Sequence, residues 1–179
     1  MANLQQYPAK ICHTAAGMLI HDNKVLLIHH KKLHLWLCPG GHMEDGELPH
    51  QAAEREFLEE TGVKVETYDP LYTRNSKITE YVPSPVETNL HWICEQNFQE
   101  RRSDPKAYAK APLRMKGCEQ HVGFVYMVRS VGTLDLSPQM EEVTQIRWIS
   151  REEVTSFDLS EDMKAQLTHG FALVDTLEK

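Results

Sequence analysis

The chain has 179 residues, of which 41% are hydrophobic and 25% are charged, and its formal net charge is −7 with histidine neutral. This length and composition fit a single globular domain with a buried core and exclude a wholly disordered chain. No apolar run approaches the roughly 18–20 residues that span a bilayer, and an acidic chain is a poor sequence-independent binder of nucleic acid.

The cysteine pattern and the N-terminus bear on the compartment. The four cysteines are widely spaced: Cys12, Cys38, Cys94 and Cys118. The first residues lack the basic start and the apolar stretch of a secretion signal, so we expect free thiols in a reducing compartment and a cytoplasmic protein. Residues 1–10 are polar and are expected to be flexible, which leaves residues 11–179 as one predicted domain.

The first part of the chain has the pattern of a β-hairpin. Ile11–Ile20 is apolar enough for a buried strand, and Lys24–His30 is a second β-rich run. The turn signal Asp22-Asn23 separates the two runs, so together they predict a hairpin. Trp36–Gly41 is a short extended piece that ends in residues which break regular structure.

A helix and further strands are predicted next. Leu48–Thr61 is rich in helix-forming residues, and Gly62 follows at the position of a C-terminal cap. Four later stretches have the composition of strands: Val63–Tyr72, Leu90–Cys94, His121–Arg129 and Gln145–Ile149. Ser150 and Glu153 form a capping box, which predicts the start of a short helix.

The C-terminal segment predicts a final amphipathic helix. Apolar residues recur there at spacings of three and four: Met163, Leu167, Phe171, Val174 and Leu177. These spacings place them on one face, which we expect to pack against the sheet. Strands and helices interleave without strict β-α-β regularity, so the predicted fold class is α/β, with a mixed sheet and helices on both faces.

Three glutamates on the predicted helix form the most informative cluster. Each helical residue advances about 100°, so Glu56, Glu59 and Glu60 share a face roughly 100° wide. Like charges at this spacing destabilise a helix, and the helix dipole disfavours anions in the last turn. One interpretation is a solvated acidic face. The other is a site for Mg²⁺ or Mn²⁺, which prefer oxygen ligands and are often shared with substrate phosphates.

Neighbouring residues favour the metal site. Arg55 could orient a carboxylate or bind a phosphate through its planar guanidinium. Gly40 and Gly41 let the backbone approach closely, so a carbonyl there could complete a metal shell. Glu47, at the helix entrance, could act as a counter-charge at the helix N-terminus or as a further metal ligand, directly or through water.

These residues form one continuous pattern. Gly41 is followed after five residues by Glu47, and after seven more by the run Arg55–Val63, REFLEETGV. The pattern resembles the Nudix box, G-x5-E-x7-R-E-U-x-E-E-x-G-U with U a bulky apolar residue, and it matches at every defined position. Weaker resemblance extends to Trp36–Gly41 before the box and to Ile146–Glu153 near the end of the chain.

The resemblance implies a Nudix-type α/β/α sandwich with a mixed sheet. It also implies a pyrophosphohydrolase that cleaves small nucleoside diphosphates linked to another group. By this resemblance Glu56, Glu59 and Glu60 bind Mg²⁺ or Mn²⁺. In the family, the carbonyl of the glycine before the box often joins them as a ligand, and the corresponding residue here is Gly40. The arginine of the box, here Arg55, holds a glutamate in place.

Two features remain open within the resemblance. The general base in the family is either a box glutamate or a glutamate on a loop before the last strand, which nominates Glu142 and, after it, Glu141, with His121 as a third candidate. The alternative to an enzyme is a non-catalytic Nudix-fold module that binds or senses a nucleotide. Such modules usually lose box glutamates, whereas this chain keeps them.

Residues 101–116 reverse the charge of the acidic chain, with six basic residues against one acidic. They belong to a predicted basic insertion near residues 97–120. In one interpretation the segment is a loop that covers the site, draws in phosphates through Arg101 and Arg102, and stacks Tyr108 on a base. In the other it is a solvated insertion between two strands.

Two weaker patterns complete the sequence. His91-x-x-Cys94 and Cys118-x-x-His121 look like halves of a zinc site, although a spacing of three in a strand points side chains to opposite faces, which favours ordinary strand residues. Tyr81 lies eighteen residues beyond the end of the box, where a diadenosine-polyphosphate subgroup carries a tyrosine. Nucleoside triphosphates are equally plausible substrates, and both a monomer and a homodimer stay open.

Overall fold

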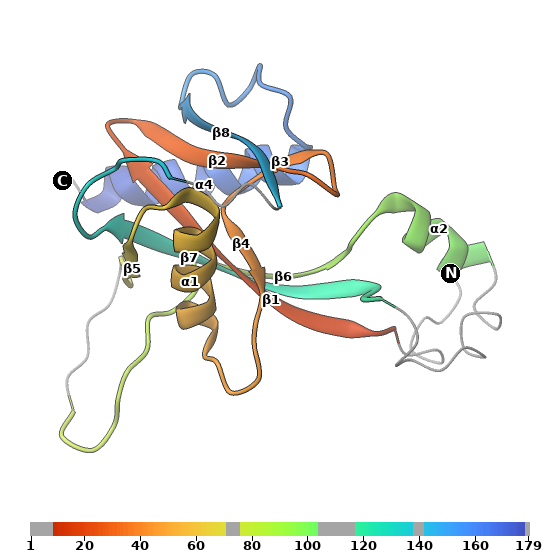
Figure 1. Ribbon diagram of the computed structural model, residues 1–179, viewed down its shortest axis with the longest axis horizontal. Helices are drawn as coiled ribbons and strands as arrows, with labels where there is room; N and C mark the ends of the chain where they lie inside the picture. The colour runs from red at the N-terminus through yellow and green to blue at the C-terminus, as the bar shows by residue number, and fades with distance from the viewer. Residues whose placement is uncertain (1–8, 71–75, 104–116, 138–141, 178–179) are drawn as a thin grey trace.

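A computed structural model describes residues 9–70, 76–103, 117–137 and 142–177. Within these residues the chain forms one eight-stranded mixed sheet and three helices (Figure 1). The strands are β1 (Ile11–His21), β2 (Lys24–His30), β3 (Leu35–Leu37), β4 (Gly40–His42), β5 (Val65–Thr67), β6 (Glu87–Trp92), β7 (Gln120–Ser130) and β8 (Val143–Ser150). The helices are α1 (Pro49–Thr61), α2 (Glu95–Ser103) and α4 (Glu161–Leu177).

The sheet is organised around two long central strands, β1 and β7, which pair in parallel. The other pairings are antiparallel: β2, with β3 and β8, extends from β1, and β5 and β6 both pair with β7. The short strand β4 pairs with β1 and sets Gly40 beside Ala16. The predicted hairpin is confirmed, and its turn residues Asp22 and Asn23 both have positive φ.

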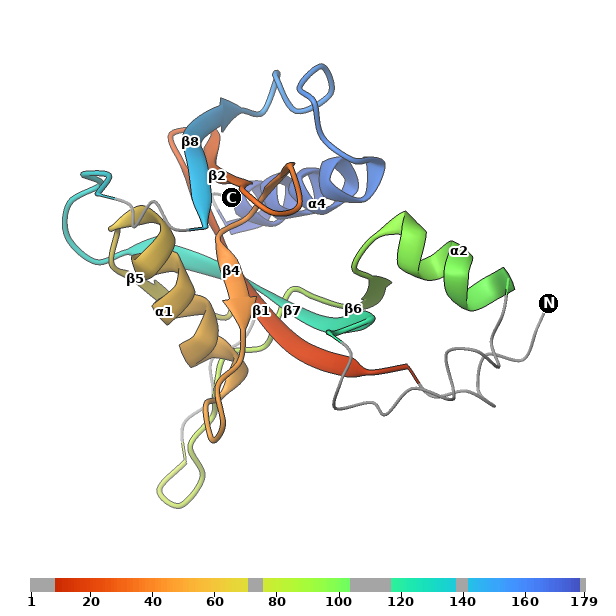
Figure 2. The ribbon, with the colours of Figure 1, turned by 45° about the vertical axis from the view of Figure 1, so that its right-hand side comes forward.

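Two cores cover the two faces of this sheet, because side chains alternate along each strand. Met18 of β1 and Met127 of β7 pack with Leu167 and Phe171 of α4. The adjacent Leu19 lies in the other core, which includes Ala52, Ala53 and Phe57 of α1. Figure 2 shows α1 and α4 as separate layers beside the sheet. The predicted α/β class and the C-terminal helix are therefore confirmed.

The structure corrects three local predictions. The strand predicted over Val63–Tyr72 is restricted to β5 within the described residues. Ser150 and Glu153 make both bonds of a capping box, but turns rather than a helix follow. The first residues of the basic segment, 101–103, are the last turn of α2 and not a loop.

The prediction of four free thiols is wrong for two of them. Cys12 and Cys118 form a disulfide, while Cys38 and Cys94 are free. The pairing escaped prediction because it depends on the parallel register of β1 and β7, which brings together residues separated by 106 positions. Among the described residues, no helix combines the length and the apolar character that crossing a bilayer requires.

Candidate active site

Helix α1 carries the glutamate cluster and begins and ends as predicted to within one residue. Pro49 stands at its first position, where no helical N–H is needed. The side chain of Gln51 accepts a hydrogen bond from the N–H of Leu48 at 3.0 Å. Gly62 closes the helix in the left-handed conformation, with φ 77°. These ends fix the register of the helix and hence the direction in which its glutamates point.

Arg55 is the centre of the site. Its Nε and Nη2 donate to the two carboxylate oxygens of Glu47, at 2.9 and 3.0 Å. Its Nη1 donates to Glu56 at 2.9 Å and to Glu59 at 3.2 Å, and Nη2 also donates to the carbonyl of His42 at 2.9 Å. One guanidinium thus holds three carboxylates and the end of β4 in fixed relation.

Strand β4 lies directly against these carboxylates. A Cβ at Gly41 would lie 2.5–2.6 Å from the carboxylate atoms of Glu56, so only glycine allows this approach. The N–H of Gly40 donates to Oε2 of Glu60 at 2.8 Å. The structure therefore brings together Gly40, Glu56 and Glu60, three of the predicted metal ligands.

Electrostatics at the site are unfavourable without a cation. Burial raises the pKa of Glu60 to about 8, although the N–H of Gly40 opposes this, and the negative charges of Glu56 and Glu142 raise it further. Burial also raises the pKa of Glu56, against the lowering effect of Arg55. A bound divalent cation offsets the cost of ionising buried carboxylates that lie close together. The donor set therefore fits Mg²⁺ or Mn²⁺.

Glu47 and Glu142 occupy different parts of the site. Both oxygens of Glu47 accept from Arg55, whose hydrogen bonds lower the pKa of Glu47. Glu47 thus anchors the arginine, and its role as a metal ligand stays a prediction. Glu142 lies just before β8 and pairs with Nζ of Lys32 at 2.7 Å, which lowers the pKa of Glu142. Its charge still acts on Glu56 and Glu60.

One known protein family matches most of the chain. The family model for the NUDIX domain matches residues 12–170. The chain belongs to the Nudix family. The solved structure of a NUDIX family hydrolase from Clostridium perfringens has a TM-score of 0.65 at 24% identity, covering 90% of this chain and 97% of that one. This similarity shows the Nudix fold and confirms the predicted sandwich.

Curated Nudix relatives match shorter stretches. A putative 8-oxo-dGTP diphosphatase of Bacillus subtilis (strain 168) is 44% identical over 45 residues, which are 25% of this chain and 30% of that protein. The 8-oxo-dGTP diphosphatase of Proteus vulgaris is 41% identical over 61 residues, which are 31% of this chain and 54% of that protein. The chain therefore spans about a third to a half of the length of these relatives.

The predicted substrate residues belong to different parts of the chain, and one of them lies outside the described residues. Tyr81 is 46% exposed between β5 and β6. Arg102 is exposed on α2, whereas Arg101 is buried and its Nη2 contacts Glu119 at 2.6 Å, a placement that does not support phosphate binding. Tyr108 lies outside the described residues, as does Glu141, the second candidate for the general base. The substrate roles of Tyr81, Arg101, Arg102 and Tyr108 stay predictions.

His121, the third candidate base, belongs to a separate group of side chains. Its ring lies 4.9 Å from that of His42 and 5.5 Å from that of His91. Burial lowers the pKa of His121 to about 4, and His42 and His91 lower it further. Of the suggested zinc pattern, Cys94 is free and exposed, while His91 and His121 lie opposite each other in the antiparallel pair of β6 and β7.

Sequence reasoning missed two participants near the site. Lys32, which pairs with Glu142, sits in the turn between β2 and β3 and carries no motif. His42 is one of the undefined positions of the box pattern, yet its carbonyl contacts Arg55 and its ring contacts Cys118. Its position directly after the two glycines was the only available signal.

Proposed function

We propose that the protein is a Mg²⁺- or Mn²⁺-dependent pyrophosphohydrolase of small nucleoside diphosphate derivatives. One observation carries the proposal: Arg55 gathers Glu47, Glu56 and Glu59, while Glu60 is held against Gly40 with a pKa of about 8. A helix that had only to fold would not concentrate buried carboxylates in this way.

Each residue has a definite task in this proposal. Glu56 and Glu60, with the carbonyl of Gly40, would hold the ion, and Glu59 would complete the oxygen donors from the more exposed edge. Arg55 positions these carboxylates and does not need to touch substrate. When bound, a divalent ion neutralises phosphate charge, polarises a phosphoryl oxygen and lowers the pKa of a water.

Glu142 is the base that the geometry favours. It lies at the open rim, with its side chain 53% exposed, yet its charge affects both Glu56 and Glu60. Its lowered pKa keeps it ionised at neutral pH and able to accept a proton from an attacking water. Lys32 holds it in place in the absence of substrate.

The named relatives and the position of one tyrosine support two classes of substrate. The two relatives named for 8-oxo-dGTP support a nucleoside triphosphate, and the position of Tyr81 supports a dinucleoside polyphosphate as the second choice. In both, the cleaved bond joins two phosphoryl groups. A nucleoside triphosphate leaves its nucleoside on one product, whereas a dinucleoside polyphosphate leaves a nucleoside on each product.

A substrate panel with matched variants tests the proposal. Nucleoside triphosphates, dinucleoside polyphosphates, nucleotide sugars and dinucleotides are assayed with Mg²⁺ or Mn²⁺, using the parent chain, Glu60→Gln and Glu54→Gln. Glu54 is the matched control because it lies on the same helix but accepts from the backbone N–H and the hydroxyl of Thr67, both at 2.7 Å.

The outcomes separate an enzyme from a binding module. We expect metal-dependent turnover by the parent and by folded Glu54→Gln, and a loss of about 10³-fold or more in Glu60→Gln. Turnover that survives both a chelator and Glu60→Gln would contradict the assigned site. Nucleotide binding without turnover of any substrate would identify a sensing module instead.

A further inference from the structure

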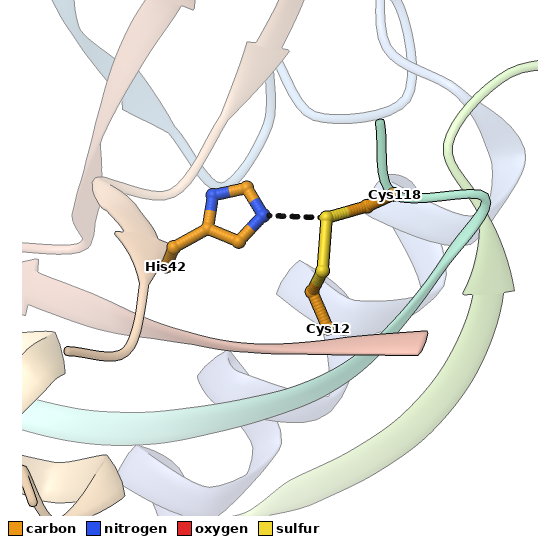
Figure 3. A group of neighbouring side chains, drawn as sticks. All are labelled: Cys12, His42 and Cys118. Carbon is orange, nitrogen blue, oxygen red and sulfur yellow. Dashed lines mark hydrogen bonds between the residues drawn. A yellow bond between two sulfur atoms is a disulfide. The ribbon is translucent and has the colours of Figure 1, made fainter. Parts of the chain in front are cut away.

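A second cluster of ligand-type side chains lies apart from the carboxylates. Cys12 of β1, His42 of β4 and Cys118, two residues before β7, place their ligand atoms within 4.8 Å of one another (Figure 3). Nε2 of His42 lies 3.4 Å from Sγ of Cys118, which is bonded to Cys12. His42 is exposed and both cysteines are partly accessible, so solvent reaches the group.

Strand register brings these residues to one face of the sheet. Cys12 is paired with His121 in the parallel ladder, and Thr14, two residues further along β1, is paired with His42. Residues paired across strands, or two apart in one strand, point to the same side. Gly41 faces Glu56 on the opposite side. The cluster and the carboxylate site therefore use opposite faces of β4.

His121 supplies a fourth candidate ligand at this face. Its Nε2 is buried and has no hydrogen-bond partner among the described residues. Its ring lies edge-on to that of His42, with centroids 4.9 Å apart. A buried imidazole nitrogen without a partner is uncommon, because burying a polar atom without a hydrogen bond is costly.

We propose that Cys12, Cys118 and His42 form a zinc site when the disulfide is reduced, with His121 as the fourth ligand. Two thiolates and two imidazoles are a tetrahedral zinc set, with Zn–S distances of about 2.3 Å and Zn–N distances of about 2.0–2.1 Å. The ligand atoms of Cys12, His42 and Cys118 already lie within 4.8 Å of one another and need only small shifts to meet one ion, which the ring of His121 would approach from beside His42.

The cluster can form the disulfide or bind zinc through both cysteines, but it cannot do both at once. A dithiol reductant breaks the bond between Cys12 and Cys118, passes one proton to each sulfur and is itself oxidised to a disulfide. Zn²⁺ then replaces the two thiol protons, which are released to solvent. The disulfide form has no thiolate to offer, so it cannot hold the ion in this way.

Ligand type separates this site from the carboxylate site. Thiolate and imidazole select zinc over Mg²⁺, whereas carboxylates and carbonyls favour Mg²⁺ and Mn²⁺. The zinc proposal does not depend on the proposed hydrolysis, since it uses none of Arg55, Glu56 or Glu60. Failure of either proposal leaves the other intact.

Cobalt binding tests the zinc proposal with a signal that carboxylates cannot give. The chain is reduced with dithiothreitol, freed of reductant under nitrogen and titrated with Co²⁺ in excess Mg²⁺, which competes with Co²⁺ for carboxylate ligands but not for thiolates. Absorption from thiolate-to-cobalt charge transfer reports sulfur ligation, and circular dichroism reports folding. The samples are the parent in reduced and oxidised form, Cys118→Ser, His42→Gln and the control Cys94→Ser.

We expect one Co²⁺ per chain in the reduced parent and in Cys94→Ser, displaced by one equivalent of Zn²⁺. His42→Gln keeps both cysteines, so it should fold and bind Co²⁺ at least about tenfold more weakly. Cys118→Ser and the oxidised parent should lack the charge-transfer band. A reduced parent without the band, whether folded or unfolded, would overturn the proposal, as would a band of full intensity in Cys118→Ser.

Discussion

The two faces of β4 carry opposite chemistry. On one face, the box carboxylates of α1 gather around Arg55, and burial raises the pKa of Glu60. On the other, His42 meets a pair of cysteines. The first group is local in sequence and supplies hard oxygen donors, while the second joins distant strands and supplies sulfur and nitrogen. A strand of only three residues, β4, can therefore keep apart two groups of side chains that prefer different metals.

The largest expected effect is the loss of a buried metal ligand on the carboxylate face. Glu60→Gln keeps an acceptor for the N–H of Gly40 but cannot take the negative charge that binding a cation requires. We expect kcat/KM to fall by about 10³-fold or more. The melting temperature of the metal-free protein at neutral pH should change little, because a carboxyl group with a pKa of about 8 is already largely protonated there. Steady-state kinetics and thermal unfolding of the same samples measure both. A fall of less than tenfold would remove Glu60 from the ligand set.

A smaller effect is expected when only the positioning group changes. Arg55→Lys retains the positive charge but cannot donate in parallel to Glu47 while also reaching Glu56. We expect activity or Mn²⁺ affinity to fall about 10–100-fold. Isothermal titration with Mn²⁺ separates the metal effect from kcat. If the lysine variant matched the parent in both, the positioning role would be wrong.

The raised pKa of Glu60 predicts how metal binding varies with pH. The folded chain holds this proton more tightly than the unfolded chain does, so the metal-free protein loses stability as the pH rises from 4.5 through about 8. Metal binding needs the deprotonated form and should therefore strengthen over the same range, by up to about tenfold per pH unit. Titrations with Mg²⁺ at pH 6, 7 and 8 test this, and Glu60→Gln should abolish most of the slope.

The smallest effect on hydrolysis is expected from a substitution in the cluster of Cys12, His42 and Cys118. Cys118→Ser opens a disulfide that closes a loop of about a hundred residues, which should lower the free energy of unfolding by about 2–4 kcal/mol. Because this cluster faces away from Glu56, kcat/KM measured well below the melting temperature should stay within about threefold. Urea unfolding and kinetics provide the two values. A large loss of kcat in a folded variant would mean that the two faces are coupled.

The difference between the faces also explains what the sequence could predict. The carboxylate site lies within the segment Gly41–Val63, where helix periodicity and fixed spacing specify which side chains meet. The cysteine cluster depends on β1 lying parallel to β7, and spacing along one chain does not reveal which distant strands become neighbours. Sequence spacing therefore associates Cys118 with His121 and Cys94, and it gives no sign of the bond between Cys118 and Cys12.

In the basic segment, too, the sequence shows the charge of the side chains but not which of them become buried. Its charge reversal was visible, but the burial of Arg101 against Glu119 depends on the packing of α2 beside the sheet. A charge count treats every arginine as solvent-facing, and most are. Only Arg102, exposed on the same helix turn, fits that expectation among the described arginines of this segment.

A crystal soaked with Mn²⁺ and a nonhydrolysable nucleoside polyphosphate gives the most direct test of the central claim, because anomalous scattering locates the ion. The account predicts a peak between the carboxylates of Glu56 and Glu60 and the carbonyl of Gly40, with phosphate oxygens completing the shell. Carboxylates directed into solvent, with the ion bound elsewhere, would contradict it.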